Sequence, residues 1–69
     1  MIYIELLLLN GEIVRIECSR KFEDALYETI ENTMKRGDWL CRARFDGCIF
    51  TYMGIHIDRV NMRQVAAML

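Results

Sequence analysis

The stretch IELLLLNGEIVRIE, residues 4–17, decides the fold because it holds two strand-like segments on either side of an Asn-Gly dipeptide. Asn-Gly between leucine-rich and β-branched runs is a strong signal for a tight β-hairpin. A strand with one solvated face should alternate apolar and polar residues, yet Leu6 to Leu9 are all apolar. The register of the hairpin therefore has to explain where each leucine points.

Two registers are available, and they differ in the length of the loop. A two-residue turn at Asn10-Gly11 sets Leu6 against Arg15 and mixes polar and apolar residues on both faces. A three-residue loop over residues 9–11, with Gly11 in the left-handed position of a bulge, separates them. We predict the second register. It pairs Leu6 with Val14, Ile4 with Ile16 and Ile2 with Cys18 on the inner face, and Leu7 with Ile13, Glu5 with Arg15 and Tyr3 with Glu17 on the outer face.

Composition predicts a single compact domain over residues 1–69. The chain has 54% hydrophobic residues, no proline and a net charge of -1, so no overall field attracts nucleic acid or an acidic membrane. The three cysteines lack the close spacing of metal ligands or of a disulfide framework. There is no basic leader and no apolar segment of about 20 residues. We therefore expect a soluble cytoplasmic protein without cofactor or metal.

Residues 20–36 are predicted to form the main helix. Ser19 is a suitable N-cap, and Gly37 is suited to the residue after the last turn. The inward stripe is predicted to be Phe22, Ala25, Leu26, Ile30 and Met34. The opposite face is acidic, and we expect it to bind a partner. Its residues are Glu23, Asp24, Glu28 and Glu31.

The second half of the chain predicts another hairpin, residues 38–45 and 48–53, turning at Asp46-Gly47. Trp39, Cys41, Ala43 and Phe45 would share one face with Cys48, Phe50 and Tyr52. Gly54 marks a bulge or bend, after which residues 55–60 extend the strand or form a fifth one. For residues 61–69 we predict a short helix capped by Asn61, with a tight turn into an edge strand as the alternative. The predicted class is α+β, an antiparallel sheet of two hairpins in the order ββαββα.

The sequence offers few residues in the spacing that a catalytic site or a metal site requires. A cysteine nucleophile would need His56 as base with Asp46 or Asp58 to orient it, but all three cysteines lie on predicted apolar faces. Zinc could take three thiolates and the His56 imidazole, yet these residues are spread over several strands. We therefore expect no enzymatic activity and no metal site.

Arginines offer a ligand-binding alternative. Arg42 and Arg44 would project from the face of the third strand, with Arg59 and Arg63 near the same end, and guanidinium groups bind phosphates in fork geometry. This arrangement predicts binding or sequestering of a nucleotide or nucleic acid. A solvated sheet face is the competing interpretation, and it fits the near-neutral total charge better.

The leading prediction is a non-enzymatic protein that binds another protein and itself. A domain this small that lacks a disulfide or a metal usually has to oligomerise to be stably folded. The predicted oligomer interface is the outer sheet face, comprising Tyr3, Leu7, Ile13, Leu40, Ile49 and Met53. In size, hairpin-helix order and lack of motifs the chain resembles small proteins of phages and other mobile elements. Some of those inhibit host defence proteins or sequester signal nucleotides, and the resemblance implies an inhibitor-type role.

Overall fold

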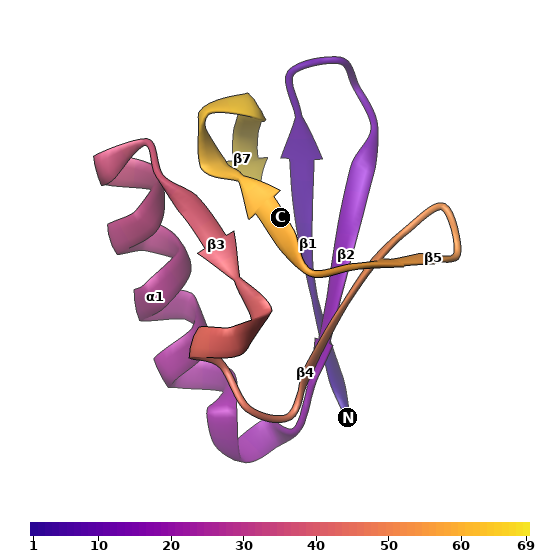
Figure 1. Ribbon diagram of the computed structural model, residues 1–69, viewed down its shortest axis with the longest axis vertical. Helices are drawn as coiled ribbons and strands as arrows, with labels where there is room; N and C mark the ends of the chain where they lie inside the picture. The colour runs from indigo at the N-terminus through magenta and orange to yellow at the C-terminus, as the bar shows by residue number, and fades with distance from the viewer.

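A computed structural model describes residues 1–69 and confirms the α+β class. Its elements are β1 (Ile2–Leu8), β2 (Ile13–Cys18), α1 (Glu23–Arg36), β3 (Trp39–Cys41), β4 (Cys48–Tyr52), β5 (Ile55–Ile57), β6 (Arg59–Asn61) and β7 (Val65–Met68). Five strands form an antiparallel sheet in the order β5-β4-β2-β1-β7, while β3 and β6 make a separate two-stranded ribbon. Helix α1 and this ribbon cover one face of the sheet (Figure 1).

The first hairpin has the predicted register. Leu6 lies opposite Val14, Ile4 opposite Ile16 and Glu5 opposite Arg15. The Leu8 amide donates to the Glu12 carbonyl at 2.8 Å, which closes the three-residue loop. Gly11 has a φ of 88°, the left-handed conformation that the bulge requires. The leucines consequently differ in their exposure to solvent. Leu6 is fully buried, and Leu9 is exposed in the loop.

Helix α1 begins at Glu23, three residues later than predicted, because Arg20–Phe22 form a 3-10 turn. The Phe22 amide donates to the Ser19 carbonyl at 3.0 Å, so the Ser19 backbone rather than its hydroxyl starts the helical segment. Gly37 ends the helix with a φ of 66°, as expected.

The inward stripe of α1 is rotated from the prediction. Leu26 and Ile30 are buried as expected, but Ala25 is exposed and Thr33 takes its place inside. A buried threonine is tolerated here because its hydroxyl donates to the Thr29 carbonyl at 2.6 Å. The stripe therefore follows residues 26, 30 and 33, which share one helical face.

The predicted second hairpin is wrong. Residues 42–44 form a 3-10 turn, and β3 pairs with β6 instead of β4. Strand β4 pairs with β2 on one side and with β5 on the other. The 3-10 turn changes the direction of the chain after β3. Asp46-Gly47 then lies in the loop that precedes β4. The second hairpin of the sheet is β4–β5, which turns at Met53-Gly54. Residues 55–60 thus contribute two strands, β5 and β6.

The C-terminal residues form an edge strand, which was the alternative prediction, rather than a helix. Asn61 does cap a turn, since its side-chain oxygen accepts from the Arg63 amide at 3.1 Å. That turn is a single 3-10 segment, Met62–Gln64, followed by β7. Strand β7 pairs with β1, and the Leu69 amide donates to the Glu5 carbonyl at 2.8 Å. The backbone of these last residues gains sheet hydrogen bonds that an isolated two-turn helix could not match.

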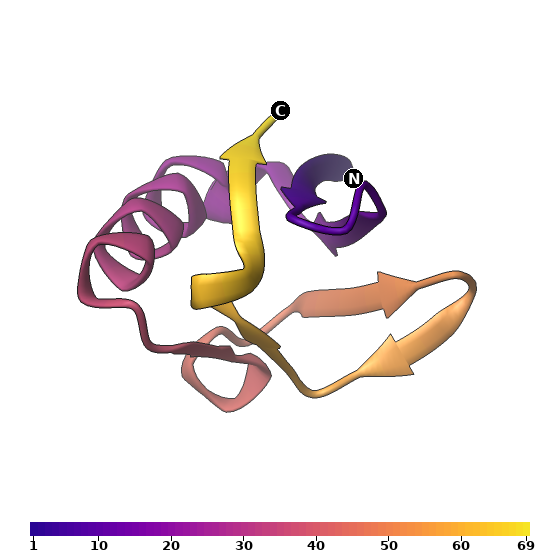
Figure 2. The same cartoon turned by 90° about the horizontal axis from the view of Figure 1, so that it is seen from above.

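The core lies between the sheet, α1 and the β3–β6 ribbon, as seen from above in Figure 2. Every layer contributes apolar side chains that are nearly inaccessible to solvent. They are Ile4, Leu6, Val14, Ile16, Cys18, Leu26, Ile30, Leu40, Cys48, Phe50, Val60, Met62 and Val65. No helix of the protein is long and apolar enough to cross a membrane.

The Met53-Gly54 turn is a site where a substitution should stabilise the protein. Met53 has a φ of 50° and Gly54 a φ of 77°, the pattern of a two-residue turn with both central residues left-handed. Asparagine adopts this conformation more readily than methionine. Met53→Asn is therefore expected to raise the free energy of unfolding of the single chain by about 0.5–1 kcal/mol. Urea unfolding measures this, and Gly54→Ala should shift the midpoint in the opposite direction.

Candidate interaction surface

The face of the sheet turned away from α1 has no second layer over it, and we call it the open face. Strand alternation and the registers assign its residues. They are Tyr3, Glu5 and Leu7 of β1, Ile13, Arg15 and Glu17 of β2, Ile49 and Thr51 of β4, His56 of β5 and Ala67 of β7.

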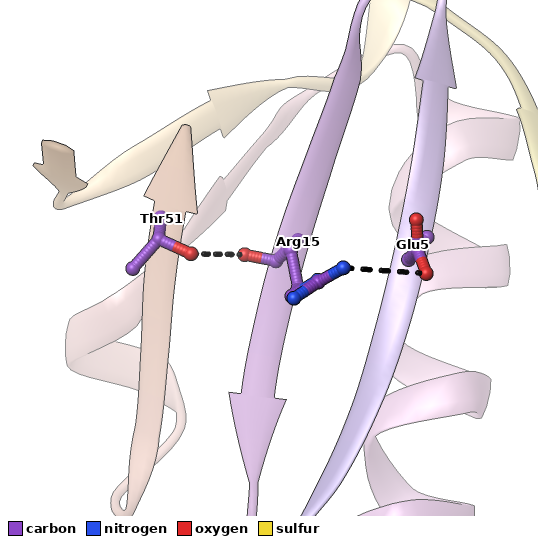
Figure 3. A network of polar contacts seen from close by, with 3 residues as sticks. All are labelled: Glu5, Arg15 and Thr51. Atoms are coloured by element: carbon purple, nitrogen blue, oxygen red, sulfur yellow. Dashed lines mark hydrogen bonds and ion pairs between the residues drawn. The ribbon is translucent and has the colours of Figure 1, made fainter. Parts of the chain in front are cut away.

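A polar row crosses the middle of the open face. Figure 3 shows the Thr51 hydroxyl donating to the Arg15 carbonyl at 3.2 Å, and Arg15 reaching Glu5 with 3.9 Å between charged atoms. The Arg15 guanidinium also lies 5.0 Å from the centre of the Tyr3 ring. Because the Glu5–Arg15 pair is exposed and loosely closed, it contributes little to stability alone. Both charges are accessible to a partner.

Apolar residues flank this polar row on both sides. Tyr3 is 54% exposed and Ile13 is 45% exposed, although both belong to central strands. Leu7 and Ile49 are half-buried, and Met53 at the end of β4 is 78% exposed. A shallow hollow lies between them, lined by Glu5, Ile13, Arg15, Thr51, Met53 and Gly54. The open face thus combines apolar contact area with one accessible pair of opposite charges.

One residue of the predicted oligomer interface lies elsewhere. Leu40 is 2% exposed and packs in the core, because β3 belongs to the ribbon and turns this side chain inward. Trp39 takes the outer position instead and is 42% exposed, with the Arg59 guanidinium 4.8 Å from its ring centre. The other five predicted residues lie on the open face or at its rim.

The four arginines of the alternative prediction have different local surroundings. Arg42 and Arg44 are exposed, but they lie on a 3-10 turn rather than on a sheet face. Arg42 lines a hollow that also contains Asp46 and Asp58, whose carboxylates disfavour an anion. Arg59 stacks on Trp39, and the Arg63 Nε donates to the Gly37 carbonyl at 2.8 Å at the end of α1. Arg59 and Arg63 thus have partners within the chain, whereas Arg42 and Arg44 are exposed.

The acidic surface of α1 is formed as predicted. Asp24, Glu28 and Glu31 are exposed and Glu23 is half-buried, and none of them forms an ion pair. Glu23 and Asp24 lie in the first helical turn, where negative charge stabilises the positive end of the helix dipole. The acidic surface lies on the opposite side of the protein from the open face.

The cysteines and the histidine are separated by the sheet. Cys18 and Cys48 lie on its inner face, whereas His56 pairs with Thr51 and is exposed on the outer face. Burial raises the pKa of the Cys18 thiol above its ordinary value, and burial beside Cys18 raises the pKa of Cys48 to about 12. Both thiols therefore stay protonated at neutral pH and lack the thiolate that a nucleophile needs.

The sequence predicts a strand at residues 55–57 but not its pairing with β4, and it favours a helix over the edge strand β7, so it misses their place on the open face. The β1–β2 part was found from the hairpin register alone. No protein-family model, curated protein or solved structure matches this chain.

Proposed function

We propose that the protein is a small non-enzymatic interaction protein that assembles as a homodimer through its open face. The observation that carries the proposal is the apolar surface at Tyr3, Ile13 and Met53, which is exposed on a sheet that has a layer on one side only. An exposed apolar patch of this kind is typical of a protein-binding surface.

The occupant best suited to this face is a second copy of the chain. A two-fold axis running between β1 and β2, parallel to the strands, would exchange the positions of register partners. Because Glu5 and Arg15 are register partners, this axis sets Arg15 against Glu5 of the second copy. Leu7 meets Ile13 of the second copy in the same way. The face is complementary to itself in charge and in apolarity.

The size of the chain also favours such a dimer. A standard interface buries roughly 800 Å² on each partner. The chain exposes 4595 Å², so this interface would take less than a fifth of its surface. A domain of 69 residues buries only about 60% of its unfolded surface, less than larger domains bury, and a dimer interface would add to its core.

The acidic surface of α1 stays free in this dimer and is the part we assign to another protein. Two copies would present it twice, which suits a basic partner surface. An inhibitor carried by a phage or another mobile element, acting on a host defence protein in the cytoplasm, is the context we propose for this activity. The three free thiols suit a reducing compartment.

The dimer is tested by reversing charges at its centre. The unmodified chain is expected to have twice the chain mass in light scattering at micromolar concentration. Arg15→Glu sets two carboxylates against each other, so the dimer should dissociate about tenfold more readily. Glu5→Arg combined with Arg15→Glu restores the opposite charges and should restore the dimer.

Arg44→Glu is the matched control because it makes the same charge change away from the open face. It should leave the mass unchanged. A monomeric unmodified chain would overturn the proposal. So would a dimer that tolerates both Arg15→Glu and Ile13→Glu, provided circular dichroism shows that these variants remain folded.

Nucleotide or nucleic-acid binding has weaker support. Its favourable feature is the exposed Trp39 with Arg59 stacked on it, since aromatic and guanidinium planes stack on bases. The carboxylates of Asp46 and Asp58 beside Arg42 count against it. Replacing Trp39 and Arg59 together would abolish binding if this alternative held, and would leave the dimer intact.

A further inference from the structure

Two cysteines face each other across the core side of the sheet. Cys18, the last residue of β2, lies in register with Cys48, the first residue of β4. Their exposed fractions are 0% and 1%, so no solvent separates them. The third cysteine, Cys41, lies on β3 of the ribbon and is partly exposed.

The hydrogen-bond pattern shows which kind of antiparallel pair this is. The Leu8 amide donates to the Glu12 carbonyl, and alternation along the β1–β2 ladder then gives Cys18 backbone bonds toward β1. The Cys48 amide donates to the Phe45 carbonyl at 3.4 Å, which is also away from Cys18. Cys18 and Cys48 therefore form a non-hydrogen-bonded pair, the kind in which side chains approach most closely.

The spacing of such a pair suits a disulfide. Opposite Cα atoms of a non-hydrogen-bonded antiparallel pair are about 4.5 Å apart. Disulfides form across Cα separations of about 4.4–6.8 Å. Both side chains also point to the same face of the sheet, since they are register partners. The bond can close without a change in the pairing of β2 with β4.

We propose that Cys18 and Cys48 are an oxidation site that closes to an intramolecular disulfide. The two S–H bonds break and one S–S bond forms, with two protons and two electrons passing to an oxidant. With a diazene oxidant such as diamide, the N=N bond accepts both and becomes a hydrazine. With a small disulfide oxidant, its S–S bond is cleaved and two thiols leave.

Because both thiols are buried, the disulfide should form slowly and should be reduced slowly once it has formed. The raised pKa values of both thiols leave little thiolate at neutral pH, and an oxidant reaches them only when the sheet end opens. The closed loop runs from residue 18 to residue 48 and includes α1 and β3. A bond that restrains so much of the unfolded chain should stabilise the fold.

The test uses the Cys41→Ala variant, which keeps only the two paired thiols. After diamide at pH 8, its intact mass should fall by two hydrogen atoms, and its free thiols should disappear on unfolding. Peptide mapping should find residues 18 and 48 joined. The oxidised chain should unfold at a temperature about 10 °C higher, and a phosphine reductant should reverse the shift.

Cys18→Ala is the matched control because it retains Cys41 and Cys48, which are not register partners. It should form no disulfide within the chain under the same treatment. Retention of both thiols in Cys41→Ala after prolonged oxidation would overturn the proposal. A linked product that unfolds at a lower temperature than the reduced chain would overturn it as well, because the bond would then distort the sheet.

Discussion

Phe50→Ala is expected to lower the free energy of unfolding by about 3–5 kcal/mol. Phe50 is fully buried in β4, between Ile16 on β2 and Ile57 on β5. Removing the ring leaves a cavity between the sheet, α1 and the ribbon. These elements cannot all move inward to fill it. A domain of this size has a total stability of only about 3–10 kcal/mol, so the variant should be mostly unfolded at 37 °C.

Ile55→Ala is the control for Phe50→Ala because Ile55 belongs to the same hairpin and is 66% exposed. It should lower the unfolding free energy by less than about 1 kcal/mol. Guanidinium unfolding followed by circular dichroism compares the two. Equal losses in both variants would show that Phe50 does not fill the core as described.

Gly37→Val is expected to lower the unfolding free energy by about 2–3 kcal/mol. Gly37 ends α1 with a φ of 66°, which β-branched residues adopt only under strain. A Cβ atom there would lie 3.2 Å from the Arg63 Nε, the same atom that donates to the Gly37 carbonyl. The valine would therefore strain the backbone and displace the arginine that holds the helix end to the C-terminal turn.

Gly37→Asn separates the two contributions, since asparagine tolerates the left-handed conformation but still meets Arg63. Its expected loss is about 1 kcal/mol, again from urea or guanidinium unfolding. If valine and asparagine had the same effect, backbone strain at Gly37 would not be the cause.

Local signals predicted the first half of the fold correctly. Between β1 and β2 the loop, the face of each residue and the charge pair at Glu5–Arg15 all follow from one choice of register. The helix also follows from its own residues, apart from the 3-10 turn at its start and the inward place of Thr33. These features depend on neighbours close in sequence, and sequence patterns report such neighbours well.

The second half depends on partners far apart in the chain. Asp46-Gly47 is a good turn dipeptide, but the turn it makes leads out of a 3-10 segment and does not join paired strands. The partner of β3 is β6, and β4 joins β2 from the first half of the chain. No local pattern distinguishes these pairings from a simple hairpin, so the prediction puts Leu40 on the wrong side. The apolar periodicity of residues 61–69 favours a helix, whereas the structure has the alternative, the edge strand β7.

The residues of the open face were likewise predicted correctly where they belong to the first hairpin. Tyr3, Leu7 and Ile13 were placed correctly because their positions come from the first hairpin. The prediction of the arginine group depended on the wrong hairpin. Arg42 and Arg44 lie on a 3-10 turn, Arg59 stacks on Trp39, and Arg63 donates to the Gly37 carbonyl. The rest of the open face includes Thr51 of β4 and His56 of β5. Its residues depend on strand pairings that the sequence did not predict.

The pairing of β1 with β7 also affects how the chain folds as it is synthesised. Strand β1 is synthesised well before β7, so one of its edges is completed only when residues 65–69 follow. At about 5–20 residues per second, that edge stays unpaired for several seconds. During this time the apolar β1–β2 hairpin can pair with other nascent chains. Slower translation should therefore increase aggregation of this protein, and a chaperone that covers β1 should reduce it.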